Sequence, residues 1–247
     1  MMPQRREWFG EWFDSPYYHV LYRERDHREA EQFMENLVNK LQLSGQHKIL
    51  DVACGKGRHS IYLNRKGFNV AGLDLSEQNI EYARQFENDR LHFYVHDMRL
   101  AFAQKEFDVA LNLFTSFGYF NTEKENEIAI CAIAESIKTN GIFLLDFLNP
   151  YTVVHNLKPA EVKLVEGIEF YISKHLSEDN FILKDIEFSD EGKTYHFQEK
   201  VKAIRRMEFL RYFETAGLTP QGIYGSYQFD PYVAETSDRM IFVLRKD

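Results

Sequence analysis

Residues 49–57 read Ile-Leu-Asp-Val-Ala-Cys-Gly-Lys-Gly, and the architecture of the chain is best inferred outward from them. An apolar run leads into two glycines separated by one residue, and a helical pattern follows at residues 58–66. Glycine lets the backbone approach a ligand closely, and the first N–H groups of a helix point at such a ligand. The stretch therefore predicts a strand, a ligand-contacting glycine loop and a helix.

Similar apolar runs, bounded by polar residues or glycine, recur along the chain. They occupy residues 47–53, 68–75, 91–96, 107–114 and 142–148. Helical patterns follow three of them, at residues 58–66, 77–86 and 123–139. Strands that alternate with helices at this spacing form a parallel sheet with helices on both faces. A helical pattern at 204–216 and two apolar runs, at 223–229 and 239–245, close the chain.

Two regions depart from this alternation. Between residues 161 and 203 the helical period is absent, and alternating segments at 162–176, 181–188 and 195–201 are separated by polar turns. This pattern predicts an antiparallel β insertion at 160–202. At the other end, residues 1–44 contain an aromatic-rich segment from Trp8 to Tyr22 and an amphipathic helical pattern from His27 to Leu43. We expect one domain over 1–247, with both regions roofing its active site and the aromatic segment acting as a lid.

The composition limits the partners of the chain. Its 247 residues include 30 basic and 38 acidic side chains, a net charge of −8, which disfavours a nucleic-acid partner. The longest apolar stretch, 142–148, contains Asp146 and is too short to span a bilayer. Two cysteines, Cys54 and Cys131, cannot alone form a four-ligand zinc site. We expect no metal, a reducing compartment and a cytoplasmic protein without a membrane partner, and the oligomeric state stays open.

The glycine loop differs from that of dinucleotide-binding proteins. The dinucleotide pattern has a third glycine for close helix packing, and here residues 55–60 are Gly-Lys-Gly-Arg-His-Ser. Asp51 lies in the strand that leads into the loop. A carboxylate there repels a diphosphate and attracts an ammonium group. Asp51 therefore favours a ligand with an aminoacyl group over NAD.

Two further aspartates end the next two apolar runs. Asp51, Asp74 and Asp97 are evenly spaced, one strand–helix unit apart. A carboxylate in the position of Asp74 accepts hydrogen bonds from a ribose diol. Asp97 can accept a bond from the exocyclic amine of adenine, with Leu75 and Met98 on the two faces of the ring. Three acidic strand ends therefore suit a ligand that carries an ammonium group, a diol and adenine.

The motifs at 49–57, at 72–76 (Gly-Leu-Asp-Leu-Ser) and at 96–99 (His-Asp-Met-Arg) resemble those of the class I, Rossmann-like S-adenosylmethionine-dependent methyltransferases. The resemblance covers residues 45–148 and the closing helix–strand–strand tail. It implies an α/β fold: a Rossmann-like, seven-stranded, mostly parallel sheet with helices on both faces and the last strand antiparallel, plus the β insertion. The run 114–120 and the two extra regions resemble a subgroup that acts on small molecules, including sugar and glycine N-methyltransferases.

The resemblance also implies roles for individual residues. S-adenosylmethionine would be the cofactor, with Asp51, Gly55 and Gly57 at its methionine part. Asn112, or the backbone around it, would border the sulfonium. The cofactor-binding set is then Tyr22 and Arg25 (clamps for the carboxylate), Asp51, Ala53, Gly55, Gly57, Asp74, Leu75, Asp97, Met98 and Asn112.

Methyl transfer has no obligatory side chain, because the sulfonium is already an activated leaving group. A general base is needed only for a protonated nucleophile. The candidates, which the sequence does not rank, are His19, Tyr119, His155, Tyr224 and Tyr227. We expect a methyltransferase with an unidentified, small-molecule N or O acceptor. The alternatives are an NAD-type oxidoreductase and a non-catalytic S-adenosylmethionine-binding module.

Overall fold

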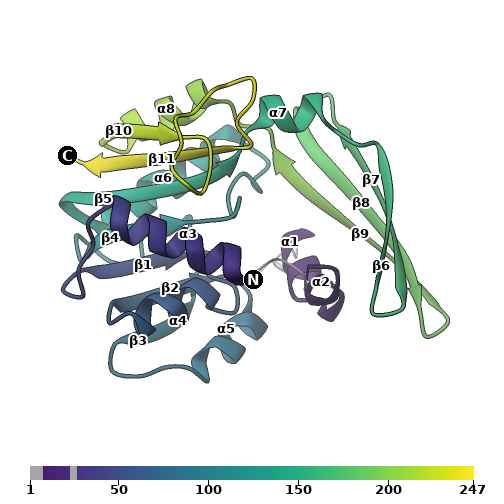
Figure 1. Cartoon of the computed structure of the whole chain (residues 1–247), viewed down its shortest axis with the longest axis horizontal. Helices are drawn as coiled ribbons and strands as arrows, with labels where there is room; N and C mark the ends of the chain where they lie inside the picture. Colours follow the sequence, from purple (N-terminus) through teal and green to yellow (C-terminus); the bar gives the residue numbers. More distant parts are fainter. Residues whose placement is uncertain (1–7, 23–26) are drawn as a thin grey trace, which may run out of the picture.

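The computed structural model describes residues 8–22 and 27–247, and Figure 1 shows them arranged around two β-sheets. The larger sheet has seven strands in the order β10-β11-β5-β4-β1-β2-β3. Only β11 runs against the direction of the other six strands of this sheet, so the predicted fold class is confirmed. The strands are β1 (Lys48–Val52), β2 (Asn69–Asp74), β3 (Leu91–Val95), β4 (Phe107–Asn112), β5 (Ile137–Leu148), β10 (Leu218–Tyr224) and β11 (Arg239–Lys246).

Helices cover both faces of this sheet. One face packs against helices α3 (His27–Lys40), α4 (Arg58–Arg65) and α5 (Glu77–Arg84). The other packs against α6 (Glu123–Ser136) and α8 (Arg206–Thr215). Parallel strands buried on both faces are almost continuously apolar, as β1 and β4 are. None of the helices in the described ranges is both long and apolar enough to cross a membrane.

The helix predicted at 123–139 ends earlier than expected. Its start is fixed by a capping box, in which Thr122 and Glu125 satisfy each other's backbone N–H groups. It ends at Ser136 because the fully buried Ile137 already pairs with Phe107 of β4. A local helical pattern cannot reveal such a long-range strand pairing.

The β insertion contains four antiparallel strands where the sequence predicted three. They are β6 (Ala160–Val165), β7 (Ile168–Leu176), β8 (Phe181–Asp190) and β9 (Lys193–Lys202). The predicted segment 162–176 is divided by a turn at Glu166 and Gly167, which both have positive φ. A separate correction concerns the strand predicted at 223–229. It ends at Tyr224, because a turn follows in which Ser226 Oγ donates to Asp230 Oδ2 over 2.6 Å.

The aromatic N-terminal segment forms two short helices, α1 (Trp8–Phe13) and α2 (Pro16–Leu21). Both lie between the two sheets, next to the inner face of the insertion (Figure 1). Trp12 and Leu21 are buried there against apolar side chains of β7 and β8. The side chain of Ser15 caps α2 by accepting the backbone N–H of Tyr17. The segment is therefore packed against the insertion.

Candidate active site

The glycine loop joins β1 to α4 and begins at a buried carboxylate. Asp51 is 1% exposed, and its Oδ2 accepts a hydrogen bond of 2.6 Å from Ser60 Oγ in α4. Burial raises the pKa of Asp51 to about 7 against this hydrogen bond, and the charge of Asp74 adds to the rise. A cation bound at this position would favour the ionised form of Asp51.

The two glycines of the loop face different surroundings. Gly55 has a φ of +55°, and no heavy atom lies within 4 Å of the place a Cβ would occupy. Gly57 has a φ of +78°, and its Cβ would lie 2.6 Å from Phe93 Cε1. Gly55 therefore borders open space, and Gly57 permits close packing of α4 on the sheet.

Asp74, at the carboxyl end of β2, faces the same loop. Its Oδ2 accepts the N–H of Gly55 at 2.8 Å, and its Oδ1 accepts the N–H of Ser76 at 2.9 Å. Burial raises the pKa of Asp74, although these two backbone bonds oppose the rise. Since a carboxylate has about four acceptor positions, Asp74 retains capacity for a diol.

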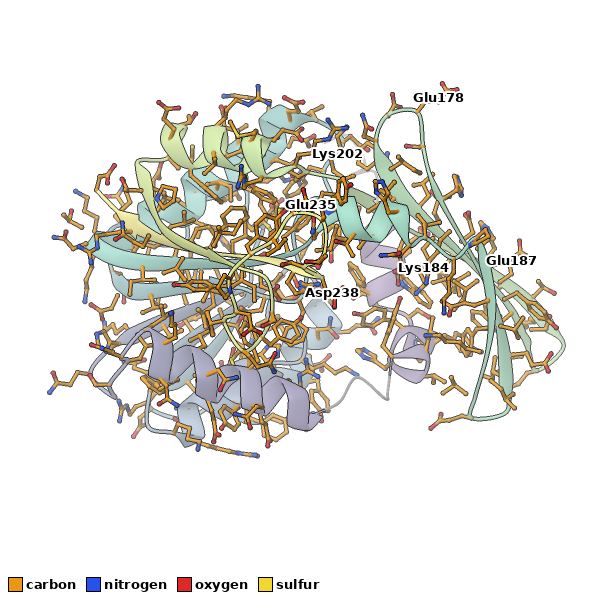
Figure 2. All side chains as sticks on the ribbon, turned by 45° about the horizontal axis from the view of Figure 1, so that its top comes forward. Glu178, Lys184, Glu187, Lys202, Glu235 and Asp238 are labelled. Atoms are coloured by element: carbon orange, nitrogen blue, oxygen red, sulfur yellow. The ribbon has the colours of Figure 1, made fainter. Side chains whose placement is uncertain are left out.

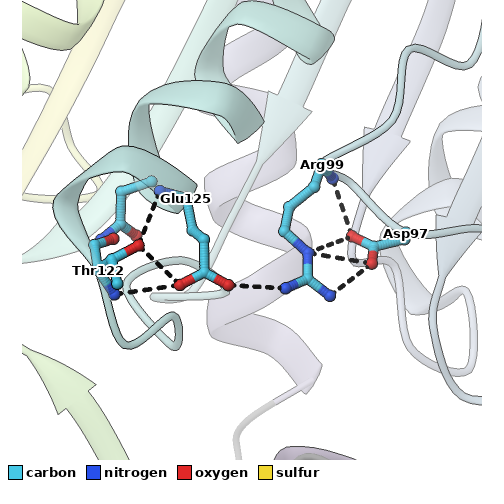
Figure 3. A network of polar contacts seen from close by, with 5 residues as sticks. Asp97, Arg99, Thr122 and Glu125 are labelled. Atoms are coloured by element: carbon cyan, nitrogen blue, oxygen red, sulfur yellow. Dashed lines mark hydrogen bonds and ion pairs between the residues drawn. The ribbon is translucent and has the colours of Figure 1, made fainter. Parts of the chain in front are cut away.

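Asp97 is held differently, as Figure 3 shows. The guanidinium of Arg99 donates to both of its oxygens, with Nη2 at 2.7 Å from Oδ2, and Nη1 of the same group donates to Glu125 at 3.0 Å. Burial would raise the pKa of Asp97, but the hydrogen bonds and charge of Arg99 outweigh it and lower the pKa. Asp97 therefore has less spare acceptor capacity for an adenine amine than Asp74 has for a diol.

These groups open onto a cavity of about 1040 Å³. The predicted residues that line it are Tyr22, Asp51, Ala53, Gly55, Asp74, Leu75, Asp97 and Met98, with the base candidates His19, Tyr119 and Tyr227. Gly57, Asn112, His155 and Tyr224 are outside the lining. Arg25 lies outside the described residues. The volume is at the upper end of the range for small-molecule sites, so there is space for a nucleoside-sized cofactor and a second molecule.

The predicted residues outside the cavity have structural contacts. Asn112 is fully buried, and its Nδ2 donates to the carbonyl groups of Val52 and Ser116, so it braces the end of β1 against the loop after β4. The His155 ring stacks on Tyr151. Lys40 Nζ lies 4.5 Å from the ring centre of Tyr224.

The loop after β4 forms one wall of the cavity. Phe114 and Thr115 have φ values of +56° and +61°, which cost non-glycine residues about 1–3 kcal/mol each. The Phe114 ring stacks on His59 at 4.9 Å and 5°. Burial and the neighbouring charge of Arg58 lower the pKa of His59 to about 3, so its imidazole is neutral. His59 also lines the cavity.

Two residues that support this wall were not predicted from the sequence. Asp146 is fully buried, and its Oδ2 accepts the N–H of Phe114 at 2.8 Å. Arg239 donates to Asp146 Oδ1 through Nε and, at 2.9 Å, to Thr115 Oγ1 through Nη2. The signal available in the sequence was one carboxylate within the apolar run 142–148.

The charged residues on the inner face of the insertion were also not predicted from the sequence. Lys174, Lys184 and Glu199 line the cavity from β7, β8 and β9. Figure 2 shows Lys184 on the side of the sheet that faces the rest of the molecule, with Glu187 on the outer side. Glu199 Oε1 accepts bonds from Trp12 Nε1 at 2.8 Å and from the Tyr22 hydroxyl, and Lys184 Nζ lies 3.7 Å from Glu199 Oε2. Alternating hairpin strands give no local signal for such a cluster.

The residues present fit S-adenosylmethionine in two of its three parts. The open space at Gly55 lies beside Asp51, which suits an ammonium group, and Asp74 retains acceptor positions for a ribose diol. For the adenine part, Leu75 lines the cavity and is 46% exposed, which offers an apolar surface to a ring. Asp97, which was predicted to accept a hydrogen bond from the adenine amine, already accepts hydrogen bonds from Arg99.

Comparison with known proteins agrees with this geometry. The sequence profile of the family described as "Methyltransferase domain" matches residues 49–141. YqeM of Bacillus subtilis (strain 168), which bears the name of a methyltransferase, is 32% identical over 81% of this chain and 84% of its own. A dTDP-3-amino-3,4,6-trideoxy-α-D-glucopyranose N,N-dimethyltransferase from Streptomyces venezuelae is 28% identical over 72% of this chain and 77% of its own.

Solved structures share the fold. An S-adenosylmethionine-dependent methyltransferase from Clostridium acetobutylicum superposes with a TM-score of 0.78 at 18% identity, covering 93% of this chain and 96% of the other. The CcbJ methyltransferase from Streptomyces caelestis gives 0.77 at 16% identity, covering 95% and 97%. From the sequence relatives and the fold together, the chain belongs to the class I, Rossmann-like S-adenosylmethionine-dependent methyltransferase family.

Proposed function

We propose that this enzyme transfers the methyl group of S-adenosylmethionine to a nitrogen or oxygen of a small polar molecule. The observation that carries the proposal is the shared cavity. Asp51, Gly55 and Asp74 border one part of it, and Lys184 and Glu199 of the insertion border another. The first group matches the polar groups of the cofactor, and the second offers charged contacts to an acceptor.

When bound, the cofactor supplies a methyl group that is already activated on a sulfonium. The protein then has to hold the reactants in line and exclude water. Asp51 would bind the ammonium group and Asp74 the ribose diol. The stacked rings of Phe114 and His59 would form an apolar wall at the reacting centre, and a ring face also attracts a positive centre.

A proton acceptor is required only if the acceptor nitrogen or oxygen arrives protonated. Of the base candidates, His19, Tyr119 and Tyr227 line the cavity. Burial and, secondarily, the charge of Lys56 lower the pKa of His19, so its imidazole is neutral and able to take a proton. We therefore favour His19 where a base is needed.

The relatives support a small acceptor. One is named for N,N-dimethylation of a dTDP-linked amino sugar, and another, from Aphanothece halophytica, is a glycine/sarcosine N-methyltransferase that is 27% identical to this chain. Both names describe a nitrogen acceptor on a small molecule.

Cys54 and Cys131 are free thiols, which supports a reducing, cytoplasmic setting.

Calorimetric titration tests the cofactor assignment. We expect S-adenosylmethionine and S-adenosylhomocysteine to bind and NAD not to bind. Asp74→Ala should weaken S-adenosylhomocysteine binding by about 1 kcal/mol or more, because charge-assisted hydrogen bonds to a diol are lost. Asp89→Ala, at an exposed position, is the matched control. Binding of NAD alone would favour the oxidoreductase alternative.

A panel of amines, amino sugars and amino acids tests the acceptor. We expect S-adenosylhomocysteine to accumulate with members of the panel and not in their absence. Cofactor binding with no product from the panel or from a small-molecule cell extract would favour the non-catalytic alternative.

A further inference from the structure

The loop after β4 is held in a conformation that its own residues do not favour. Phe114 and Thr115 are consecutive and both have positive φ, although neither is glycine and Thr115 is β-branched. Such a conformation persists only where surrounding contacts fix it. Residues 113–116 all line the cavity, so these contacts determine the shape of one of its walls.

The contacts to Phe114 and Thr115 that come from other strands are made by β5 and β11, and the hydroxyl of Tyr119 adds a bond to the carbonyl of Thr115. The carboxylate of Asp146 accepts the N–H of Phe114, and the backbone carbonyl of Asp146 accepts the N–H of Thr115 at 3.1 Å. Arg239 links the Asp146 carboxylate to the Thr115 hydroxyl. The ion pair of buried Asp146 with partly buried Arg239 thereby contacts the backbone of both strained residues and the side chain of Thr115.

Phe114 connects this wall of the cavity to the glycine loop. The Phe114 ring stacks on His59, which follows the loop by two residues at the start of α4. Tyr227 lies against the Phe114 ring, with ring centres 5.2 Å apart. A change of φ at 114 or 115 would move the Phe114 ring out of this stack.

We propose that Asp146 and Arg239 are positioning residues for methyl transfer, which hold residues 113–116 in the form that keeps Phe114 against His59 as a wall of the cavity. Neither residue reacts. Asp146 acts through the loop alone, and Arg239, which also lines the cavity, acts on the wall through Asp146 and Thr115. The inference rests on the proposed function, because the wall matters only if a cofactor binds beside the glycine loop.

The test combines hydrogen exchange of the cofactor-free protein with calorimetric binding of S-adenosylhomocysteine. In Asp146→Asn we expect amides 114 and 115 to exchange about tenfold faster and S-adenosylhomocysteine to bind roughly tenfold more weakly. Arg239→Lys keeps the charge but cannot donate to Asp146 and Thr115 with one planar group, so it should show a smaller change in both measurements.

Asp108→Asn is the matched control. Asp108 also accepts a backbone N–H, from Lys48 at 2.8 Å, and pairs with a basic side chain, Lys138, at 2.7 Å. Asp108 lies near the amino end of the central strand β4, whereas the cavity lies at the carboxyl ends of the parallel strands. If Asp146 had only a structural role, Asp146→Asn and Asp108→Asn would both lose thermal stability. Asp146→Asn would then show no loss of S-adenosylhomocysteine binding beyond that of Asp108→Asn.

Should Asp146→Asn fail to fold, Thr115→Val replaces only the hydroxyl that Arg239 contacts with a methyl group, and it leaves no buried charge unpaired. It should still accelerate exchange at 114 and 115 by about threefold and weaken binding. Unchanged exchange at these amides, or faster exchange with unchanged affinity, would overturn the inference. Absence of S-adenosylhomocysteine binding in the unmodified protein would instead overturn the proposed function, and the exchange comparison would still test the loop.

Discussion

Gly55 and Gly57 lie two residues apart in one loop, and the structure gives them different roles. We expect Gly57→Ala to lower the free energy of unfolding by about 1–3 kcal/mol, because its Cβ would overlap Phe93. Gly55→Ala should lower it by about 1 kcal/mol, from its positive φ alone, and should weaken S-adenosylhomocysteine binding. Urea unfolding and calorimetry measure the two effects.

Gly67→Ala is the control for this pair. Gly67 also has a positive φ with no atom within 4 Å of its Cβ position, and it lies outside the cavity lining. It should match Gly55→Ala in stability and leave binding unchanged. Equal losses of binding in the Gly55 and Gly67 variants would contradict the assignment of Gly55 to the ligand.

Asp51 makes stability and binding depend on pH in opposite directions. Its pKa rises from an ordinary 3.8 to about 7 on folding, so its contribution to stability is complete below the first value and is lost as pH rises through the second. A bound ammonium group needs the ionised form, so S-adenosylhomocysteine should bind more tightly as pH rises through the same window. Asp51→Asn keeps an acceptor for Ser60 and removes both effects.

Urea unfolding at about pH 5 and about pH 8 checks the stability effect. We expect Asp51→Asn to become more stable, relative to the unmodified protein, as pH rises between these values. The difference between the two proteins isolates Asp51 from other titrating groups such as His59. Parallel stability profiles would show that Asp51 is ionised throughout.

At the scale of elements, the sequence predicted the parts of the fold that depend on local pattern. The glycine loop, α4 and the acidic ends of β1 and β2 all follow from residues 49–76. What it missed depends on long-range contact: Ile137 leaves the helical pattern to pair with Phe107, and the turn at Glu166 is a single residue pair inside an alternating run.

The candidate site divides in the same way. Asp51, Gly55 and Asp74 were predictable because two short motifs, at 49–57 and 72–76, carry them. Asp146 and Arg239 were not, because their relation to Phe114 exists only after β5 and β11 have paired. Asn112 carried a motif signal but is turned into the protein, where it donates to Val52 and Ser116.

The helices α1 and α2 form an element whose attachment can be tested. Glu199 accepts bonds from Trp12 and Tyr22, and Ser76 Oγ, at the N-terminus of α5, donates to Asp14. We expect S-adenosylhomocysteine to slow hydrogen exchange over residues 11–22, as a lid would require. Glu199→Gln should speed that exchange and weaken binding about threefold, because the charge-assisted bonds are lost.

Glu187→Gln supplies the comparison for Glu199→Gln. It is the same substitution in the same sheet, on the outer face and 65% exposed (Figure 2). We expect it to change neither exchange at 11–22 nor binding. If S-adenosylhomocysteine left the rate of hydrogen exchange over residues 11–22 unchanged, the lid hypothesis would be wrong. The packing of Trp12 against the insertion would not be affected by that result.

On the scale of the whole molecule, the cavity is assembled from parts that are distant in the chain. The large sheet supplies Asp51 and Asp74, the N-terminal segment supplies Tyr22, and the insertion supplies Lys184 and Glu199. We expect the cofactor to bind at the large sheet and the acceptor at the insertion. The two binding functions should therefore be separable by substitution.

Val201 provides that separation. It lies opposite Ile182 in the pairing of β9 with β8, and both side chains line the cavity. We expect Val201→Trp to fill the insertion side and to raise the KM for an acceptor found in the panel by roughly tenfold or more. Affinity for S-adenosylhomocysteine should stay within about twofold, because the cofactor groups lie on the other sheet.

Val162→Trp controls for the added indole, since Val162 is 59% exposed in β6 and lies outside the cavity lining. It should leave both constants unchanged. If Val201→Trp weakened S-adenosylhomocysteine binding as much as it raised the acceptor KM, the insertion would contribute to the cofactor site itself. The acceptor would then have to approach from the side of Tyr227 and Arg239, where the cavity is bordered by the large sheet and its loops.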